Sequence, residues 1–185
     1  KKEKNNFINS WLLKSKKFIS KKKINIYKKK YITLVARHST KSFGQSSDLS
    51  KKNFILIVQT LIKNFPKYNI LVISNVYGCK YFKEIAKKKK FKCYFSKDIS
   101  SSFIEDGNLI LNSKAKFQYF SGGIGGFAQF SKVPYIECAA EGPASSTSRI
   151  GKYKHFIWQK KNQLHYFGDD IYFFINLIKN FKIAN

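Results

Sequence analysis

Residues 31–36 read Tyr-Ile-Thr-Leu-Val-Ala, a short run of β-branched and apolar side chains. Such a run, without alternating polar residues, is typical of a strand that is buried on both faces of a parallel sheet. A polar loop follows, and then residues 53–64 place apolar side chains at helical spacing. Ser50 is a suitable N-cap for this helix, and Pro66 follows its end. The sequence therefore predicts a strand and its crossover helix.

The same alternation continues along the chain. We expect further strands at residues 69–74, 92–95, 116–120 and 133–137. Helices are expected between them, at residues 81–89, 104–113 and 127–131. Residues 139–151, rich in Ser, Gly and Ala, predict a long loop, and Asp169 and Asp170 precede a terminal helix that packs back on the sheet. Strands and helices that alternate at these intervals along the sequence imply βαβ units. The predicted fold class is α/β, a Rossmann-like parallel sheet with helices on both faces.

The chain divides into two parts, residues 1–30 and residues 31–185. The first part carries apolar side chains at near-helical spacing among lysines and ends in a lysine-rich connector. Its amphipathic helix either lies on a membrane or between domains, or packs on the domain that follows. The second part forms one domain. Because the 185 residues include no Met, we interpret residue 1 as a cut end of a longer protein.

The composition is strongly basic, with 36 Lys and Arg against 10 Asp and Glu and a net charge of +26. Such a charge is typical of proteins that bind nucleic acid or an acidic membrane surface. Only Arg37 and Arg149 are arginines, however, whereas base readout depends on the bidentate guanidinium. Lys, Asn, Ile, Phe and Tyr, which A/T-rich codons encode, are all abundant, and this favours genomic bias as the source of the charge. Nucleic acid is therefore a disfavoured partner, while anionic lipid headgroups are compatible with this surface.

The cysteine spacing and the hydropathy of the chain indicate in which compartment the protein lies. Cys79, Cys93 and Cys138 have no CxxC spacing, which argues against a disulfide framework and against a zinc site. No run of about 18 uncharged apolar residues is present, so the sequence predicts no membrane span. We expect a cytoplasmic protein without a bound metal, and its charge fits a peripheral position at the inner membrane face.

Ligands of parallel α/β sheets bind at the carboxyl ends of the strands, and a glycine-rich run lies at one such end. Glycines between a strand and a helix let backbone N–H groups approach an anion while the helix N-terminus adds partial positive charge, which suits phosphate. The run matches neither the dinucleotide fingerprint nor a Walker loop. Its alternative role is a turn whose glycines allow close helix–strand packing. Its residues are Ser121, Gly122, Gly123, Ile124, Gly125 and Gly126.

Side chains at other predicted strand ends add to this candidate site. Arg37 has a fork of donors that fits a diphosphate, unless it only caps the strand end at the surface. His38 beside it either carries a proton or donates a hydrogen bond to phosphate, or it is a structural residue. Glu137 either accepts ribose hydroxyl groups or is a solvent-facing strand end, and Ser74 and Asn75 follow the second strand. No recognisable catalytic set is present, so the catalytic residues stay unassigned.

Two stretches of the chain resemble a known enzyme family. Residues 108–136, NLILNSKAKFQYFSGGIGGFAQFSKVPYI, resemble the carboxyl-terminal half of GT-B glycosyltransferases, in both heptosyltransferase-like and fucosyltransferase-like enzymes. Residues 31–41, YITLVARHSTK, are similar to the fucosyltransferase segment in which a strand ends in an arginine that contacts the donor diphosphate. The resemblance covers most of residues 31–137 and implies one half of a GT-B fold.

This resemblance implies a domain that binds a nucleotide-diphosphate sugar as its substrate and needs no further cofactor. It places Arg37 and Lys41 near the diphosphate, the glycine-rich run around it and Glu137 near the ribose. The acceptor would be a surface glycan or a lipid-linked molecule, and its site would belong to an amino-terminal half outside this chain. Two alternatives stay open, a basic nucleic-acid-binding α/β module and a non-catalytic remnant of a transferase.

Overall fold

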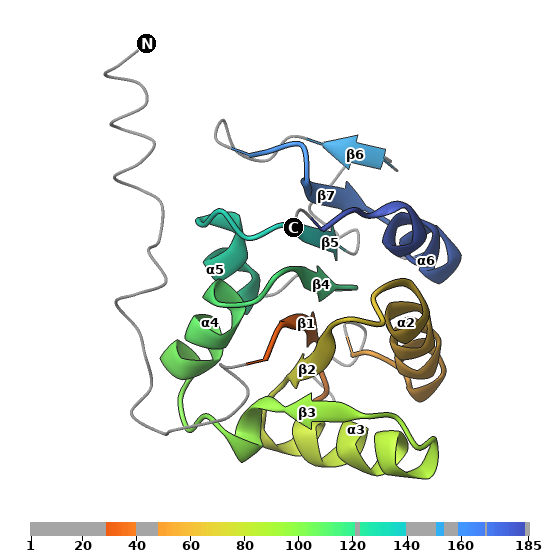
Figure 1. Cartoon of the computed structure of the whole chain (residues 1–185), viewed down its shortest axis with the longest axis vertical. Helices are drawn as coiled ribbons and strands as arrows, with labels where there is room; N and C mark the ends of the chain where they lie inside the picture. Colours follow the sequence, from red (N-terminus) through yellow and green to blue (C-terminus); the bar gives the residue numbers. More distant parts are fainter. Residues whose placement is uncertain are drawn as a thin grey trace.

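The computed structural model describes residues 29–39, 48–120, 123–139, 151–153, 159–168 and 170–183. These residues form a seven-stranded sheet with helices packed on it (Figure 1). The strand order is β3-β2-β1-β4-β5-β7-β6, in which the β6–β7 pair is antiparallel and all other pairs are parallel. The strands are β1 (Tyr31–Val35), β2 (Asn69–Ile73), β3 (Cys93–Phe95), β4 (Lys116–Gln118), β5 (Tyr135–Ala139), β6 (Gly151–Tyr153) and β7 (Gln163–Phe167).

The order of the six parallel strands places β1, the first described strand in the chain, in the middle of the sheet. Successive strands run outward from β1 to β3 on one side, and the chain then returns to β4 and runs outward to β5 and β7 on the other. This is the strand order of the Rossmann fold, with β7 in the place of the sixth strand. The α/β class predicted from the sequence, with a Rossmann-like parallel sheet, is confirmed.

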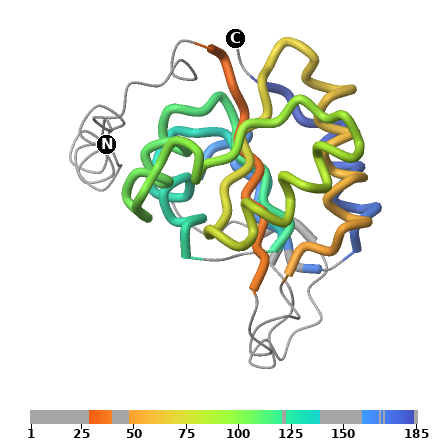
Figure 2. Tube along the Cα trace, turned by 90° about the horizontal axis from the view of Figure 1, so that it is seen from below, coloured from red at the N-terminus to blue at the C-terminus, as the bar shows by residue number. Residues whose placement is uncertain are grey.

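Helices cover both faces of the sheet, as expected (Figure 2). Right-handed crossovers put α2 and α3 on one face, and the reversed direction of the chain after β3 puts α4 and α5 on the other. The last helix, α6, packs beside α2. The helix bounds are α2 (Lys51–Asn64), α3 (Val76–Lys88), α4 (Phe103–Leu111), α5 (Gly126–Gln129) and α6 (Ile171–Asn180).

The two faces of β1 contribute to different parts of the core. Ile32 and Leu34 are buried in the cluster that includes α2, α3 and α6. Tyr31 and Val35 are buried on the opposite face, in the cluster that includes Leu109 of α4. Burial of both faces explains why this strand is a continuous apolar run in the sequence.

Side-chain caps determine where the crossover helices begin. Ser50 Oγ accepts the backbone N–H of Asn53 at 3.2 Å, which confirms the predicted N-cap of α2. Asn75 Oδ1 accepts the N–H of Gly78 at 2.7 Å and caps α3 in the same way. Helix α3 therefore begins at Val76, and the expected start at residue 81 is wrong.

The carboxyl-terminal part of the chain differs more from the expected pattern. Asp170 caps α6 by accepting the N–H of Tyr172 at 2.8 Å, as predicted, whereas Asp169 lies outside the described residues. Strands β6 and β7 were not expected. The predicted amphipathic helix, in residues 1–28, and most of the predicted loop, in residues 140–150, also lie outside the described residues. Within the described ranges, no helix combines the length and the apolar character needed to cross a bilayer.

Candidate ligand-binding site

A cavity of about 780 Å³ lies at the carboxyl edge of the sheet, where the direction of the chain reverses between β1 and β4. Open α/β sheets bind ligands in this position, and the volume falls in the range of about 300–1,000 Å³ that is usual for small-molecule sites. The ends of β1, β2 and β4 and the starts of α3 and α4 contribute to the cavity. It brings together five of the predicted site residues, which are Arg37, Ser74, Asn75, Gly123 and Ile124.

Arg37 lies at the cavity because an acidic residue holds the loop after β1. Arg37 Nε is 3.7 Å from Asp48 Oδ1, and the other carboxylate oxygen of Asp48 accepts the N–H of Ser39 at 2.7 Å. This contact is longer than a hydrogen bond, so it uses none of the five N–H donors of the guanidinium. The Arg37 side chain is 44% exposed, which leaves these donors accessible to a ligand.

His38 follows Arg37 but is not among the residues that line the cavity. Its ring stacks on Tyr81 of α3, with 4.1 Å between the ring centroids. Its carbonyl oxygen accepts a hydrogen bond of 2.7 Å from Asn75 Nδ2, and its Nδ1 lies 3.8 Å from Asp48 Oδ2. These contacts join the loop after β1 to the start of α3.

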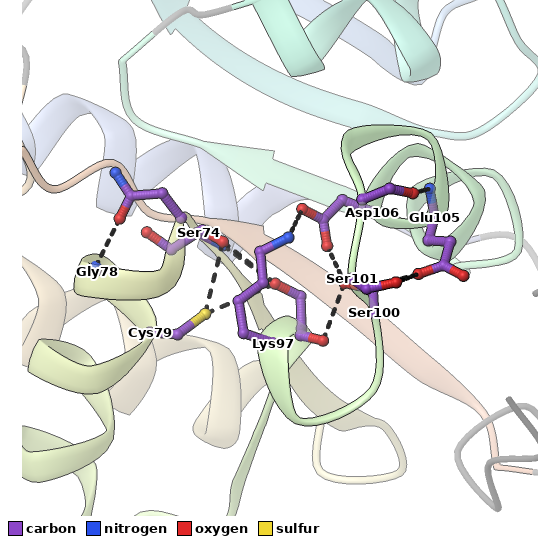
Figure 3. Close-up of polar contacts among 11 residues, drawn as sticks. Ser74, Gly78, Cys79, Lys97, Ser100, Ser101, Glu105 and Asp106 are labelled. Atoms are coloured by element: carbon purple, nitrogen blue, oxygen red, sulfur yellow. Dashed lines mark hydrogen bonds and ion pairs between the residues drawn. The ribbon is translucent and has the colours of Figure 1, made fainter.

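The junction of β2 and α3 forms the next part of the cavity. Ser74 is the first residue after β2, and its carbonyl oxygen accepts hydrogen bonds from Ser96 Oγ at 3.4 Å and Cys79 Sγ at 3.6 Å (Figure 3). The Ser74 side chain is buried, and its hydroxyl has no hydrogen-bond partner among the described residues. Asn75 then caps α3 through Gly78. The backbone of this junction is therefore fixed, while one polar group stays unused.

The opposite side of the cavity was missed by the sequence analysis. Lys97 Nζ lies 2.5 Å from Asp106 Oδ2, and Ser100 Oγ donates to the other oxygen of the same carboxylate (Figure 3). Ser102 caps α4 by accepting the N–H of Glu105 at 3.1 Å. A serine followed three residues later by a glutamate is the capping-box pattern that marks a helix start, and this signal could have placed α4 at the sheet edge.

The glycine-rich run is only partly at the cavity. Gly123 and Ile124 line it, whereas Ser121 and Gly122, like Lys41, lie outside the described residues. Gly126 begins α5, which has four residues. One turn aligns few peptide dipoles, so the positive charge expected at this helix start is small.

Glu137 lies inside β5 and not at its end, because β5 continues to Ala139. The expected alternative of a solvent-facing strand end is therefore wrong. The Glu137 carboxylate forms an ion pair with Lys116 Nζ of β4, and both side chains are fully buried. Burial lowers the pKa of Lys116, against the raising effect of Glu137. A Cβ on Gly125 would lie 2.7 Å from Glu137 Oε1, so the glycine-rich run packs directly on this pair. The carboxylate that lines the cavity is that of Asp106.

The cavity thus combines cationic, hydroxyl and apolar groups. Arg37 and Lys97 supply positive charge, and Ile73, Phe103 and Phe120 supply apolar surface. Such a lining suits an anionic ligand that also carries rings or apolar parts. The described residues contain no group of three or more His, Cys, Asp or Glu that could hold a metal ion.

Comparisons with known proteins give no family assignment. No protein-family model matches the chain, and no curated protein matches it. The fold and the cavity define the class, an α/β domain with a Rossmann-like sheet and a ligand cavity at its carboxyl edge.

Proposed function

We propose that this chain is the donor-binding part of a glycosyltransferase and that its cavity takes a nucleotide-diphosphate sugar. The observation that carries the proposal is the cavity at the β1–β4 reversal, with Arg37 and the starts of α3 and α4 around it. The start of α3, which has no acidic residue in its first turn, and the arginine fork both favour phosphate oxygens. The resemblance of residues 31–137 to the carboxyl-terminal half of GT-B glycosyltransferases supports the same function.

The apolar part of the cavity suits the remainder of such a donor. Phe103 is 55% exposed and rests edge-to-face against Phe127, with 5.5 Å between the ring centroids. Because Phe127 supports one edge of the ring, Phe103 offers a surface on which a nucleobase can stack. Ile73 and Phe120 extend this apolar surface toward the ends of β2 and β4.

Glycosyl transfer from this donor breaks the bond between the anomeric carbon and a diphosphate oxygen. Negative charge then develops on the leaving diphosphate. An arginine whose N–H groups are held in place beforehand stabilises that charge. Arg37, positioned by Asp48, has this role in the proposal. The acceptor is a surface glycan or a lipid-linked molecule at the inner membrane face, and the general base comes from the acceptor-binding half.

Calorimetric titration with UDP-, GDP- and ADP-hexoses tests the proposal. We expect one of these donors to bind, and Arg37→Ala to weaken its binding about 10- to 100-fold, since hydrogen bonds to charged groups contribute about 1.5–3 kcal/mol. Arg37→Lys should restore little of the loss, because an ammonium lacks the planar fork.

Lys67→Ala is the matched control, because it removes one positive charge from an exposed residue before β2, at the opposite edge of the sheet. It should change the affinity by no more than about twofold, as expected for an exposed charge more than a Debye length away. Absence of binding across the panel would sink the proposal. Salt-dependent binding of single-stranded nucleic acid in its place would favour a basic nucleic-acid-binding module.

A further inference from the structure

The start of α3 holds a polar group that the folded chain does not use. Ser74 lines the cavity and is 9% exposed, and its Oγ has no hydrogen-bond partner among the described residues. Buried hydroxyl groups in proteins are nearly always hydrogen-bonded. A cavity-lining serine that departs from this rule indicates that a ligand provides the partner.

The backbone beside Ser74 also has unused donors. Helix α3 has 13 residues and no acidic residue in its first turn. Among its first N–H groups, that of Gly78 is capped by Asn75, and that of Cys79 donates to the carbonyl of Asn75. The N–H groups of Val76 and Tyr77 have no intrahelical acceptor, so they remain available at the positive end of the helix dipole.

Gly78 is the residue that makes room for this arrangement. A Cβ at this position would lie 2.0 Å from Ser74 Oγ and 3.0 Å from Ser74 Cβ, so the Ser74 side chain lies directly against the first turn of α3. Any larger residue at position 78 would displace the Ser74 hydroxyl. The glycine and the serine therefore act together at the helix start.

Positive side chains come from both sides of this helix start. Arg37 follows β1 and Lys97 follows β3, and these strands are the two neighbours of β2 in the sheet. Adjacent strands are about 4.8 Å apart, so a group in front of β2 is within reach of long side chains on either side. Asp48 holds Arg37 and Asp106 holds Lys97 in place.

We propose that the start of α3 is a phosphoryl-binding subsite. The Ser74 hydroxyl and the N–H groups of Val76 and Tyr77 donate to phosphoryl oxygens, and Arg37 and Lys97 balance the charge. The identification of this phosphoryl group with the donor's diphosphate rests on the proposed function. The subsite lies at the 13-residue α3 and not at the four-residue α5 that follows the glycine-rich run.

The test combines amide NMR spectra with the variants Ser74→Ala and Ser101→Ala. Ser101 also lines the cavity, but its hydroxyl donates to Glu105 Oε2 at 2.9 Å and lies on the α4 side, so it provides the same substitution away from the subsite. We expect inorganic pyrophosphate to shift the amide signals of Val76 and Tyr77. Ser74→Ala should weaken its binding about tenfold, at unchanged thermal stability, because the removed hydroxyl has no partner within the described chain.

Three ligands distinguish the possible outcomes. A UDP-, GDP- or ADP-hexose that shifts the same signals identifies the nucleotide diphosphate as the source, whereas a shift with geranyl diphosphate alone identifies a lipid-linked phosphate. Pyrophosphate binding without nucleotide-sugar binding supports the subsite and contradicts the proposed function. Donor binding that shifts Gly123 but neither Val76 nor Tyr77, with Ser74→Ala unchanged in affinity, overturns the subsite and leaves the function standing. No binding of any of these ligands overturns both.

Discussion

Replacement of Gly125 by alanine places a methyl group against a buried ion pair. The new Cβ would lie 2.7 and 2.8 Å from the two carboxylate oxygens of Glu137 and 3.0 Å from Lys116 Nζ. Both partners are fully buried, so neither can move aside into solvent. The glycine-rich run or the ion pair must therefore shift.

The expected cost follows from the contact distances. Inserting a methyl group into a packed interior typically costs about 1–3 kcal/mol, and reduced freedom of the unfolded chain returns about 0.4–1 kcal/mol. We expect Gly125→Ala to lower the free energy of unfolding by about 1–2 kcal/mol. For a domain of this size, that corresponds to a fall in Tm of roughly 2–8 °C.

Gly123→Ala is the matched control within the same run. Nothing lies within 4 Å of a Cβ at this position, so the alanine should be neutral or stabilise the fold by up to about 1 kcal/mol. Urea unfolding followed by far-UV circular dichroism measures both variants. Equal stability of Gly125→Ala and Gly123→Ala would refute the packing role of Gly125.

Three further predictions concern other parts of the fold. Gly107→Ala puts a Cβ 2.3 Å from the Phe127 ring, and urea unfolding should show a loss of about 1–3 kcal/mol; an unchanged midpoint would contradict the close α4–α5 contact. Lys116→Met and Glu137→Leu should each cost about 3–5 kcal/mol by leaving the partner charge buried, while the double variant with both changes should recover most of the loss; additive losses would argue against the pair. Burial raises the pKa of Cys93 from 9.0 to about 12, so the folded thiol keeps a proton that the unfolded chain releases. The free energy of unfolding should therefore fall by up to about 1.4 kcal/mol per pH unit between pH 9 and 12. In urea titrations across this window, the free energy of unfolding of the Cys93→Ala variant should fall less steeply.

The parallel strands could be predicted because burial on both faces leaves an uninterrupted apolar run, as in β1 and β2. Strand β7 was missed because it carries polar residues that the fold buries. Gln163 Nε2 donates to the carbonyl oxygens of Ser131 and Val133, at 2.9 and 3.0 Å, and His165 is also buried. Polar side chains that find partners only in the folded chain give no strand signal in the sequence.

Part of the candidate site followed from the same logic. Arg37, Ser74 and Asn75 lie together because parallel strands end at one edge of the sheet. Lys97 was missed because β3 is short and a 3₁₀ turn, Ser96–Asp98, follows it. Such a turn has no clear periodicity, so its side chains cannot be oriented from the sequence alone.

The position of β1 in the sheet has a consequence for synthesis of the protein. Tyr31 Oη donates to the carbonyl of Leu109 at 2.8 Å, and the N–H of Thr33 donates to the carbonyl of Ala115 at 2.9 Å. Tyr31 and Leu109 are 78 residues apart, a distance that ribosomes cover in about 4 to 16 s at roughly 5–20 residues per second. Throughout that interval one edge of β1 has no β4 to pair with, and the cavity does not yet exist. A ligand can therefore stabilise the finished domain but cannot assist the first steps of its folding on the ribosome.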